Sequence, residues 1–353
     1  MLRRVIILLI VFCTSGVLAY VALLDVPAEQ SAKTIAVAQP VASNLAAVKS
    51  YLRTIAGDTS SDENDDDADE DAWPPDADSP EQVMYAQAAM VRRAIDGLTP
   101  ARADSVNLYL VGFAGDGEEN VFRNEVEYVA KLFDQRFAGS GHSLILANNP
   151  QTLTRYPLAT LSNLELAANA IAGKMDRDRD ILMVFLTSHG SPDHLLYVSM
   201  DPLPLDQIAP EDLAAILAAT HVRYKVVILS ACYSGGFIDA IKSPTTLVIT
   251  AARKDRSSFG CGTDSPITYF GRAFFVDALN RTDSLTKAFS IATGLIDQWE
   301  TADKEKHSYP QIASAPQIEA QLAKWRHDIR LGPAVAFDAD TKTKTSALPA
   351  NKQ

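Results

Sequence analysis

Two runs of consecutive apolar residues constrain the fold of this chain more than any other feature. Residues 181–187 read ILMVFLT, and residues 225–229 read KVVIL. Runs of this kind are typical of strands that are buried on both faces, as in a parallel sheet. Further strands are expected at 106–113, 144–147 and 246–251. Because amphipathic stretches separate them, the pattern predicts an α/β fold with helices on both faces of a mostly parallel sheet.

Local signals place the helices between these strands. Ser79, Pro80 and Gln82 have the spacing of a capping box with proline at the first helical position, which predicts a helix that runs to about Asp96. A second capping box, Ser-Asn-Leu-Glu, predicts that another helix begins at Ser162. Helices are expected in this way at 79–96, 120–137, 162–175, 210–219, 269–279, 284–299 and 318–330.

The formal charge of −12 comes from one segment. Residues 58–81 contain twelve Asp and Glu and no Lys or Arg, so the rest of the chain is formally neutral. No basic stripe remains that would indicate nucleic-acid binding. A run so acidic and so poor in apolar residues is typical of a disordered linker, and it lacks the glycine and closing glutamate of an EF-hand. Residues 25–78 are interpreted as an Ala-rich stalk followed by this linker, and residues 331–353 as a disordered tail.

The N-terminus predicts the compartment. Arg3 and Arg4 precede a largely apolar stretch, residues 5–24, which is long enough to cross the hydrocarbon core of a bilayer. Residues 1–24 are interpreted as a signal anchor, that is, a transmembrane helix. A cleavable signal peptide that ends near Ala19 is the alternative. In either case residues 79–330, the expected folded domain, lie outside the cytoplasm, on the periplasmic side, anchored to the membrane or secreted.

Two loops place reactive side chains just past neighbouring strands. His189 and Gly190 follow the first apolar run, and Cys232 follows the second. Functional groups gather at the carboxyl ends of the strands in an open parallel sheet. A thiol and an imidazole there form a nucleophile and a general base. The amides of Gly190 and Cys232 can donate to a developing oxyanion, so the two loops predict acyl transfer.

Simpler interpretations exist for each residue taken alone. A lone cysteine after a strand is usually a small core residue, and a lone histidine in a loop is usually a surface group. Cys232 and Cys261 could instead form a disulfide in an oxidising compartment. Their joint position at successive strand ends favours His189 and Cys232 as a catalytic pair. His194, which lacks an adjacent glycine, is interpreted as peripheral. The three cysteines show no zinc-type clustering with histidines, and no metal is expected.

The two loops resemble motifs of the legumain family of caspase-like (clan CD) cysteine peptidases. Residues 188–190 (SHG) and 231–235 (ACYSG) are similar to its His-Gly and Ala-Cys-x-Ser-Gly motifs, at a similar separation. Residues 256–258 (RSS) resemble its Arg-Glu-Ser-Ser element, and residues 268–271 (TYFG) resemble its Thr-Tyr-Leu-Gly. The resemblance covers about residues 104–300. It is closest to the bacterial membrane-associated members, whose runs TSHGS and SACYSGGF are similar to those here.

This resemblance implies a caspase-like three-layer αβα sandwich and a Cys–His dyad without metal or organic cofactor. It also implies a protein or peptide substrate that is cleaved after an Asp- or Asn-type residue. The substrate-binding positions carried over from the family are Arg123, Ser230, Ser257, Ser258 and Arg272.

Three positions depart from the family's pattern. Val121 stands where the family has an asparagine that orients the histidine. Ser230 and Arg272 stand where legumain has Glu and Asp. Relative to legumain, two carboxylates are lost, Arg123 remains and Arg272 is gained. The substrate-binding pocket is therefore predicted to be more cationic than that of legumain. A guanidinium pairs well with a carboxylate, so we expect a preference for Asp or Glu over Asn.

Two alternatives stay open, one with the same chemistry and one from a different class of function. A transamidase of the same family would use the same acyl-enzyme but would resolve it with an amine. A non-catalytic caspase-like binding module would keep the fold for contacts alone. The intact Cys232 and His189 favour an enzyme over such a module.

Overall fold

The computed structural model describes residues 4–13, 16–25, 73–139, 141–262 and 265–338. The chain divides after Ala68 into two compact units. In the first unit, β1 (Arg4–Cys13) pairs with β2 (Gly16–Asp25) in an antiparallel sheet. The structure therefore does not show the helix expected over residues 1–24; the many β-branched residues of this segment suit a strand. None of the described helices has both the length and the apolar composition needed to span a membrane.

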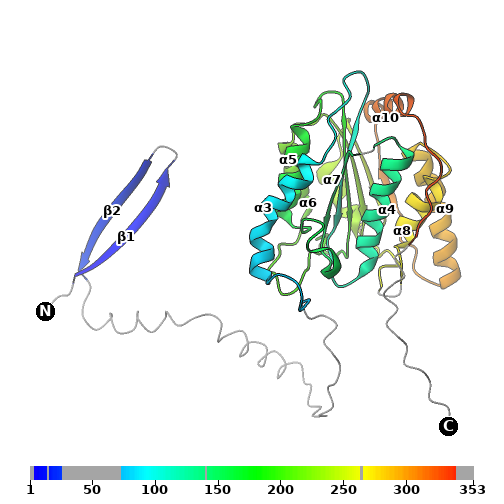
Figure 1. Ribbon diagram of the computed structural model, residues 1–353. Coiled ribbons are helices and arrows are strands. Elements are labelled where there is room, and N and C mark those ends of the chain that lie inside the picture. The colour runs from blue at the N-terminus through cyan, green and yellow to red at the C-terminus, as the bar shows by residue number, and fades with distance from the viewer. Residues whose placement is uncertain (1–3, 14–15, 26–72, 140, 263–264, 339–353) are drawn as a thin grey trace, which may run out of the picture. The chain divides into compact units, whose positions relative to one another are not determined.

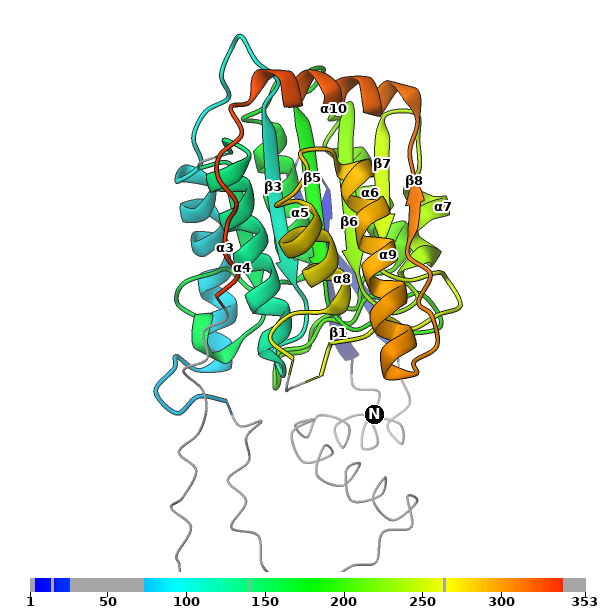
Figure 2. The same cartoon turned by 90° about the vertical axis from the view of Figure 1, so that its right-hand side faces the viewer.

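The second unit, Asp69–Gln353, is built on a six-stranded sheet with the order β4-β3-β5-β6-β7-β8 (Figures 1 and 2). The first five strands in this order are parallel, and the short edge strand β8 is antiparallel to β7. The strands are β3 (Leu108–Ala114), β4 (Ser143–Ala147), β5 (Ile181–Thr187), β6 (Tyr224–Ser230), β7 (Thr246–Thr250) and β8 (Gln311–Ala313).

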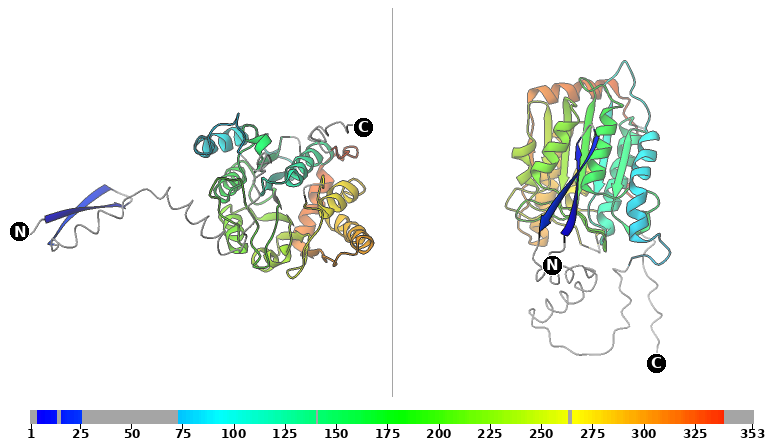
Figure 3. Two further views of the ribbon diagram at one scale, coloured as in Figure 1. Left: turned by 90° about the horizontal axis from the view of Figure 1, so that it is seen from below. Right: turned by 90° about the vertical axis from the view of Figure 1, so that its left-hand side faces the viewer.

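Helices cover both faces of this sheet, and Figure 3 shows the two helical layers from below. One face carries α5 (Leu161–Ala172), α6 (Pro210–Ala219) and α7 (Ile238–Ile241), with α3 (Pro80–Asp96) packed on α5. The other carries α4 (Asn120–Arg136), α8 (Tyr269–Gly271), the π-helical η4 (Arg272–Ala278), α9 (Leu285–Asp303) and α10 (Pro316–Asp328). Two 3-10 turns complete the elements, η2 (Pro150–Thr152) and η3 (Ser234–Phe237). The predicted three-layer αβα sandwich is confirmed.

Two apolar cores lie between these layers because side chains alternate along the strands. In β3, Leu108 and Leu110 belong to the core under α4, α9 and α10, whereas Tyr109 and Val111 belong to the core under α5 and α6. All seven residues of β5 are buried, as the run ILMVFLT predicts.

Several boundaries differ from those expected. The Ser79 capping box is confirmed, since its hydroxyl accepts from the Gln82 amide and the Gln82 side chain accepts from the Ser79 amide. The capping box expected at Ser162 is wrong: the helix starts one residue earlier, with Thr160 as its N-cap. Residues 331–338, expected in the tail, pack against α4, where Tyr128 donates to the Val335 carbonyl. Residues 26–72, which include nearly all of the expected stalk and most of the acidic linker, lie outside the described residues. The end of the tail, residues 339–353, also lies outside them.

Candidate active site

The register of the sheet brings three functional side chains to one edge. The last residues of β3, β5 and β6 lie side by side. Two positions further along each chain segment come Asp116, His189 and Cys232. The two loops predicted to be catalytic are in contact, because a Cβ on Gly190 would lie only 2.1 Å from the Cys232 carbonyl oxygen. A glycine is therefore required where the histidine loop crosses the cysteine loop.

The thiol of Cys232 lies in an environment that stabilises its thiolate. The Ser258 amide donates to Sγ at 3.2 Å, and the Ser258 hydroxyl lies 3.7 Å from it. A hydrogen bond from the thiol of Cys261 is the largest cause that lowers the Cys232 pKa, from 9.0 to about 5 against the opposing effect of burial. The same bond raises the pKa of Cys261. Both thiols are free, so the structure does not contain the disulfide considered above.

The backbone after Cys232 is tightly held. Tyr233 adopts a left-handed conformation with φ of 56°, which is strained for a side chain of its size, and its amide donates to the Arg256 carbonyl at 2.7 Å. A Cβ on Gly235 would lie 2.6 Å from the Lys254 amide nitrogen. This turn places Cys232 just past the end of β6, in contact with the loop that carries Ser257 and Ser258.

His189 is held by two carboxylates. Its Nε2 lies 3.1 Å from Glu119 Oε2 and 3.4 Å from Asp116 Oδ2. The ring packs edge-on against Phe122 at a centroid distance of 5.1 Å. Asp116 is 1% exposed, and its burial, with the neighbouring Glu119 carboxylate, raises its pKa to about 6. The three ligand atoms lie within 4.8 Å of one another, a spacing that would also admit a cation.

His189 and Cys232 do not form a hydrogen bond with each other in the part of the chain that the structure describes. Catalytic hydrogen bonds are often long in the absence of substrate, so this arrangement is compatible with a dyad. The amides of Gly190 and Cys232 likewise have no hydrogen-bond partner among the described residues. Their predicted oxyanion role stays a prediction.

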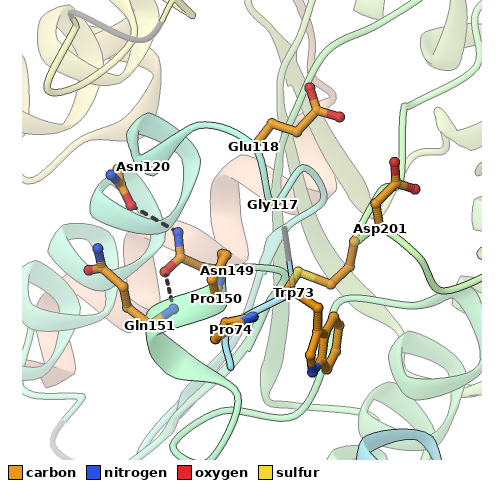
Figure 4. Close-up of a pocket in the computed structure, with 10 residues that line it drawn as sticks. Trp73, Pro74, Gly117, Glu118, Asn120, Asn149, Pro150, Gln151 and Asp201 are labelled. Carbon is orange, nitrogen blue, oxygen red and sulfur yellow. Dashed lines mark hydrogen bonds between the residues drawn. The ribbon is translucent and has the colours of Figure 1, made fainter. Parts of the chain in front are cut away.

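Two cavities are lined in part by residues that follow β3 and β6. One, of about 240 Å³, is lined by Gly117, Glu118 and Asn120, together with Trp73, Met200 and Asp201 (Figure 4). In it Asn149 donates to Asn120 Oδ1 at 2.9 Å. The second cavity, of about 450 Å³, lies beside the cysteine loop. Its lining residues are Tyr233, Asp255, Arg256, Ser257, Phe259, Lys304, Glu305 and Lys306.

The predicted substrate-binding residues do not all come together. Ser257 lines the second cavity and Ser258 contacts the nucleophile. Ser230 is only 2% exposed, and its hydroxyl is hydrogen-bonded to Thr268 at 3.1 Å inside the domain. Its placement among substrate contacts is therefore corrected, because the side chain faces the core.

The two arginines predicted to bind substrate, Arg123 and Arg272, also lie in different surroundings. Arg123 is 6% exposed, and its guanidinium donates to Asn120 at 3.3 Å. Arg272 points to solvent, stacks over Trp299 and lies 3.9 Å from Asp277. Arg272 therefore lines neither of the two cavities. The expectation that it makes the pocket cationic is not supported, because the packing of η4 turns that face outward.

The carboxylates around His189 were not predicted from the sequence. The available signal was positional: Asp116 follows β3 at the same distance as His189 follows β5. Glu119 had no such signal, since its role depends on how α4 begins. His194, interpreted as peripheral, packs its ring against Gly236 in the cysteine loop, where a Cβ would lie 2.2 Å from its Cγ.

Comparison with known protein families finds a match over the region that contains both loops. Residues 166–318 match the model of the Peptidase C13 family, the legumain family, and this span includes His189, Cys232 and Cys261. This part of the chain is therefore similar to the Peptidase C13 family. No match to the chain is found among curated proteins. This similarity suggests a cysteine peptidase that acts on proteins or peptides, and it agrees with the mostly parallel sheet.

Proposed function

We propose that this chain is a cysteine endopeptidase in which Cys232 is the nucleophile and His189 the general base. The observation that carries the proposal is the lowered pKa of the Cys232 thiol at the end of β6. A thiolate at neutral pH is a reactive nucleophile, whereas a core cysteine with a raised pKa is inert. His189 lies in the adjoining loop, whose Gly190 packs on the Cys232 backbone.

The reaction follows from these groups. Sγ of Cys232 bonds to the carbonyl carbon, and the C=O electron pair moves onto oxygen, where the amides of Gly190 and Cys232 donate to it. His189 holds the proton of the thiol and passes it to the leaving amine as the C–N bond breaks. Water then attacks the thioester, which releases the carboxylic acid and returns a proton to the thiol.

An active-site probe tests this proposal. A peptidyl acyloxymethyl ketone should alkylate Cys232 in the full-length protein, and Cys232→Ala and His189→Ala should each abolish labelling. The exposed His327 of α10 supplies the control, since His327→Ala should label like the parent. No labelling of a folded parent protein would instead favour a non-catalytic binding module. With a labelled peptide, coupling of an added amine in place of hydrolysis would identify a transamidase.

We further propose a preference for an acidic side chain at the cleaved position. The support comes from the cavity beside Ser257, which carries Arg256, Lys304 and Lys306. Its two acids are Glu305 and Asp255, and Asp255 is already paired with Arg253. Exposed pairs contribute about 1 kcal/mol or less each, so discrimination of several-fold is expected. Profiling with a peptide library tests the preference, and cleavage strictly after Asn would contradict it.

The site of action is proposed from the sequence alone. Arg3 and Arg4 before residues 5–24 support an exported, membrane-anchored domain. A C-terminal fusion to a phosphatase that is active only outside the cytoplasm should be active. Replacement of residues 5–24 by a polar sequence should abolish that activity, and an active fusion after replacement would contradict export by this segment.

A further inference from the structure

The imidazole of His189 has two nitrogens, and one of them, Nε2, lies next to carboxylate partners. Nε2 faces the two carboxylates, at 3.1 Å from Glu119 and 3.4 Å from Asp116. A carboxylate can only accept a hydrogen bond, so a neutral His189 in this position carries its proton on Nε2. Its Nδ1 is then the nitrogen left to take the proton of Cys232.

The two carboxylates are themselves fixed by their surroundings. Asp116 is 1% exposed and its Oδ1 accepts from the Glu118 amide at 3.1 Å, which directs Oδ2 to the histidine. Glu119 is the N-cap of α4, where a negative charge is stabilised by the helix dipole. The titratable groups near this cluster include His189, the Tyr197 ring at a centroid distance of 6.4 Å from the imidazole, and Cys261, whose pKa is raised in part by Glu119.

Neither carboxylate pairs with a lysine or arginine in the described part of the chain. Their only cationic partner there is His189 when it is protonated. The intermediate charge state of the proposed reaction requires such an imidazolium, and two carboxylates at hydrogen-bond distance favour it. The arrangement thus serves both orientation of the ring and stabilisation of its charged form.

We propose that Asp116 and Glu119 are positioning residues of the catalytic base, which hold His189 through Nε2 so that Nδ1 accepts the proton of Cys232. They occupy the role for which sequence comparison expected an asparagine at position 121, where Val121 is fully buried instead. The kinetic part of this inference rests on the proposed peptidase function, whereas the tautomer of His189 does not.

Kinetics give the first test. In Glu119→Gln and Asp116→Asn, kcat should fall about 10- to 100-fold with little change in KM, because general-base catalysis contributes 10²- to 10⁴-fold and only part of it is lost. The basic limb of the kcat/KM profile should move to lower pH in each variant and further in the double variant. Glu119→Asp, which keeps the charge, should leave that limb closer to the parent's.

Asp193→Asn is the matched control, since this exposed carboxylate lies in the same loop as His189, and within the described residues it forms no ion pair with His189. It should change neither kcat nor the basic limb. If kcat falls in Glu119→Gln and Asp116→Asn while the basic limb of the kcat/KM profile stays at the same pH, the two carboxylates have only a structural role. That result would overturn the proposal.

The second test does not need peptidase activity. ¹⁵N NMR of histidine-labelled protein in a Cys232→Ala background should show neutral His189 protonated on Nε2, and the Glu119→Gln, Asp116→Asn double variant should lose that preference. A proton on Nδ1 would refute the proposal. So would a stoichiometric divalent cation retained by the parent and lost from the double variant, because Nε2 would then be a metal ligand. If the parent protein is not labelled by the active-site probe but neutral His189 carries its proton on Nε2, only the proposed function is refuted.

Discussion

At the scale of single residues, Cys261 is the side chain with the largest effect on the nucleophile. Its thiol donates to the Cys232 thiolate, and this bond is the largest cause of the lowered Cys232 pKa. We expect Cys261→Ala to raise that pKa by roughly one unit, so that the thiolate forms at higher pH.

The rate of iodoacetamide alkylation of Cys232, followed by mass spectrometry across pH, measures the shift. Cys13→Ala should leave the midpoint unchanged, since Cys13 lies in the other unit. An unchanged midpoint in Cys261→Ala would mean that Ser257 and Ser258 stabilise the thiolate without Cys261.

Glu125 is a fully buried carboxyl beneath the two catalytic loops. Burial raises its pKa from 4.5 to about 7. Hydrogen bonds from the hydroxyls of Thr268, Ser230 and Thr187 lower the pKa and so oppose part of this shift. Between these values the folded protein binds a proton that the unfolded chain has released, so this group's contribution to stability is lost as pH rises from 4.5 to 7.

We therefore expect Glu125→Gln, which stays neutral, to lose less stability than the parent over this range. The difference should be on the order of 3 kcal/mol or less at the alkaline end. Urea unfolding at several pH values measures it. Glu165→Gln, at an exposed position of α5, should follow the parent throughout. Parallel pH dependence of Glu125→Gln and the parent would show that Glu125 is ionised in the folded state.

At the scale of elements, success depended on whether a signal was local. The N-cap of α3 and the strand β5 were predicted because a capping box and an apolar run are complete within a few residues. The strand β8 was missed because three half-buried residues become a strand only by pairing with β7. The outward face of Arg272 could not be predicted either, since it depends on how η4 packs against the sheet.

The turn after β6 gives a prediction at this scale. A Cβ on Gly235 would lie 2.6 Å from the Lys254 nitrogen and 2.9 Å from the Ala252 oxygen, both backbone atoms. We expect Gly235→Ala to cost about 1–3 kcal/mol and to reduce probe labelling, because the turn that holds Cys232 must shift.

Gly294 offers the matched control, since a Cβ there meets nothing within 4 Å in the described part of the chain and the residue lies within α9. Gly294→Ala should stabilise the protein by up to about 1 kcal/mol, because alanine is the better helix former. Thermal unfolding of both variants decides the matter. Equal stability of Gly235→Ala and the parent would show that the turn is adaptable.

At the scale of the whole molecule, the folded domain begins before the helix that marks its start in the sequence. Trp73 and Ala77 pack on a small core with Val83 and Leu153, and the Trp73 indole donates to the Asp78 carbonyl at 2.9 Å. The division of the chain falls at residues 68 and 69, earlier than the predicted boundary at Ser79. Residues 73–78 thus belong to the domain although they lie in the acidic stretch.

Two shortened chains test this boundary and the role of the acidic segment together. A chain that begins at Asp69 should unfold at the same temperature as the full protein, because it keeps every contact of the second unit. One that begins at Ser79 should be less stable by about 1–3 kcal/mol, since it loses the buried area of Trp73. If residues 26–68 are only a spacer, the Asp69 chain should also react with the active-site probe at the parent rate. Faster labelling would instead show that this segment restrains the active site.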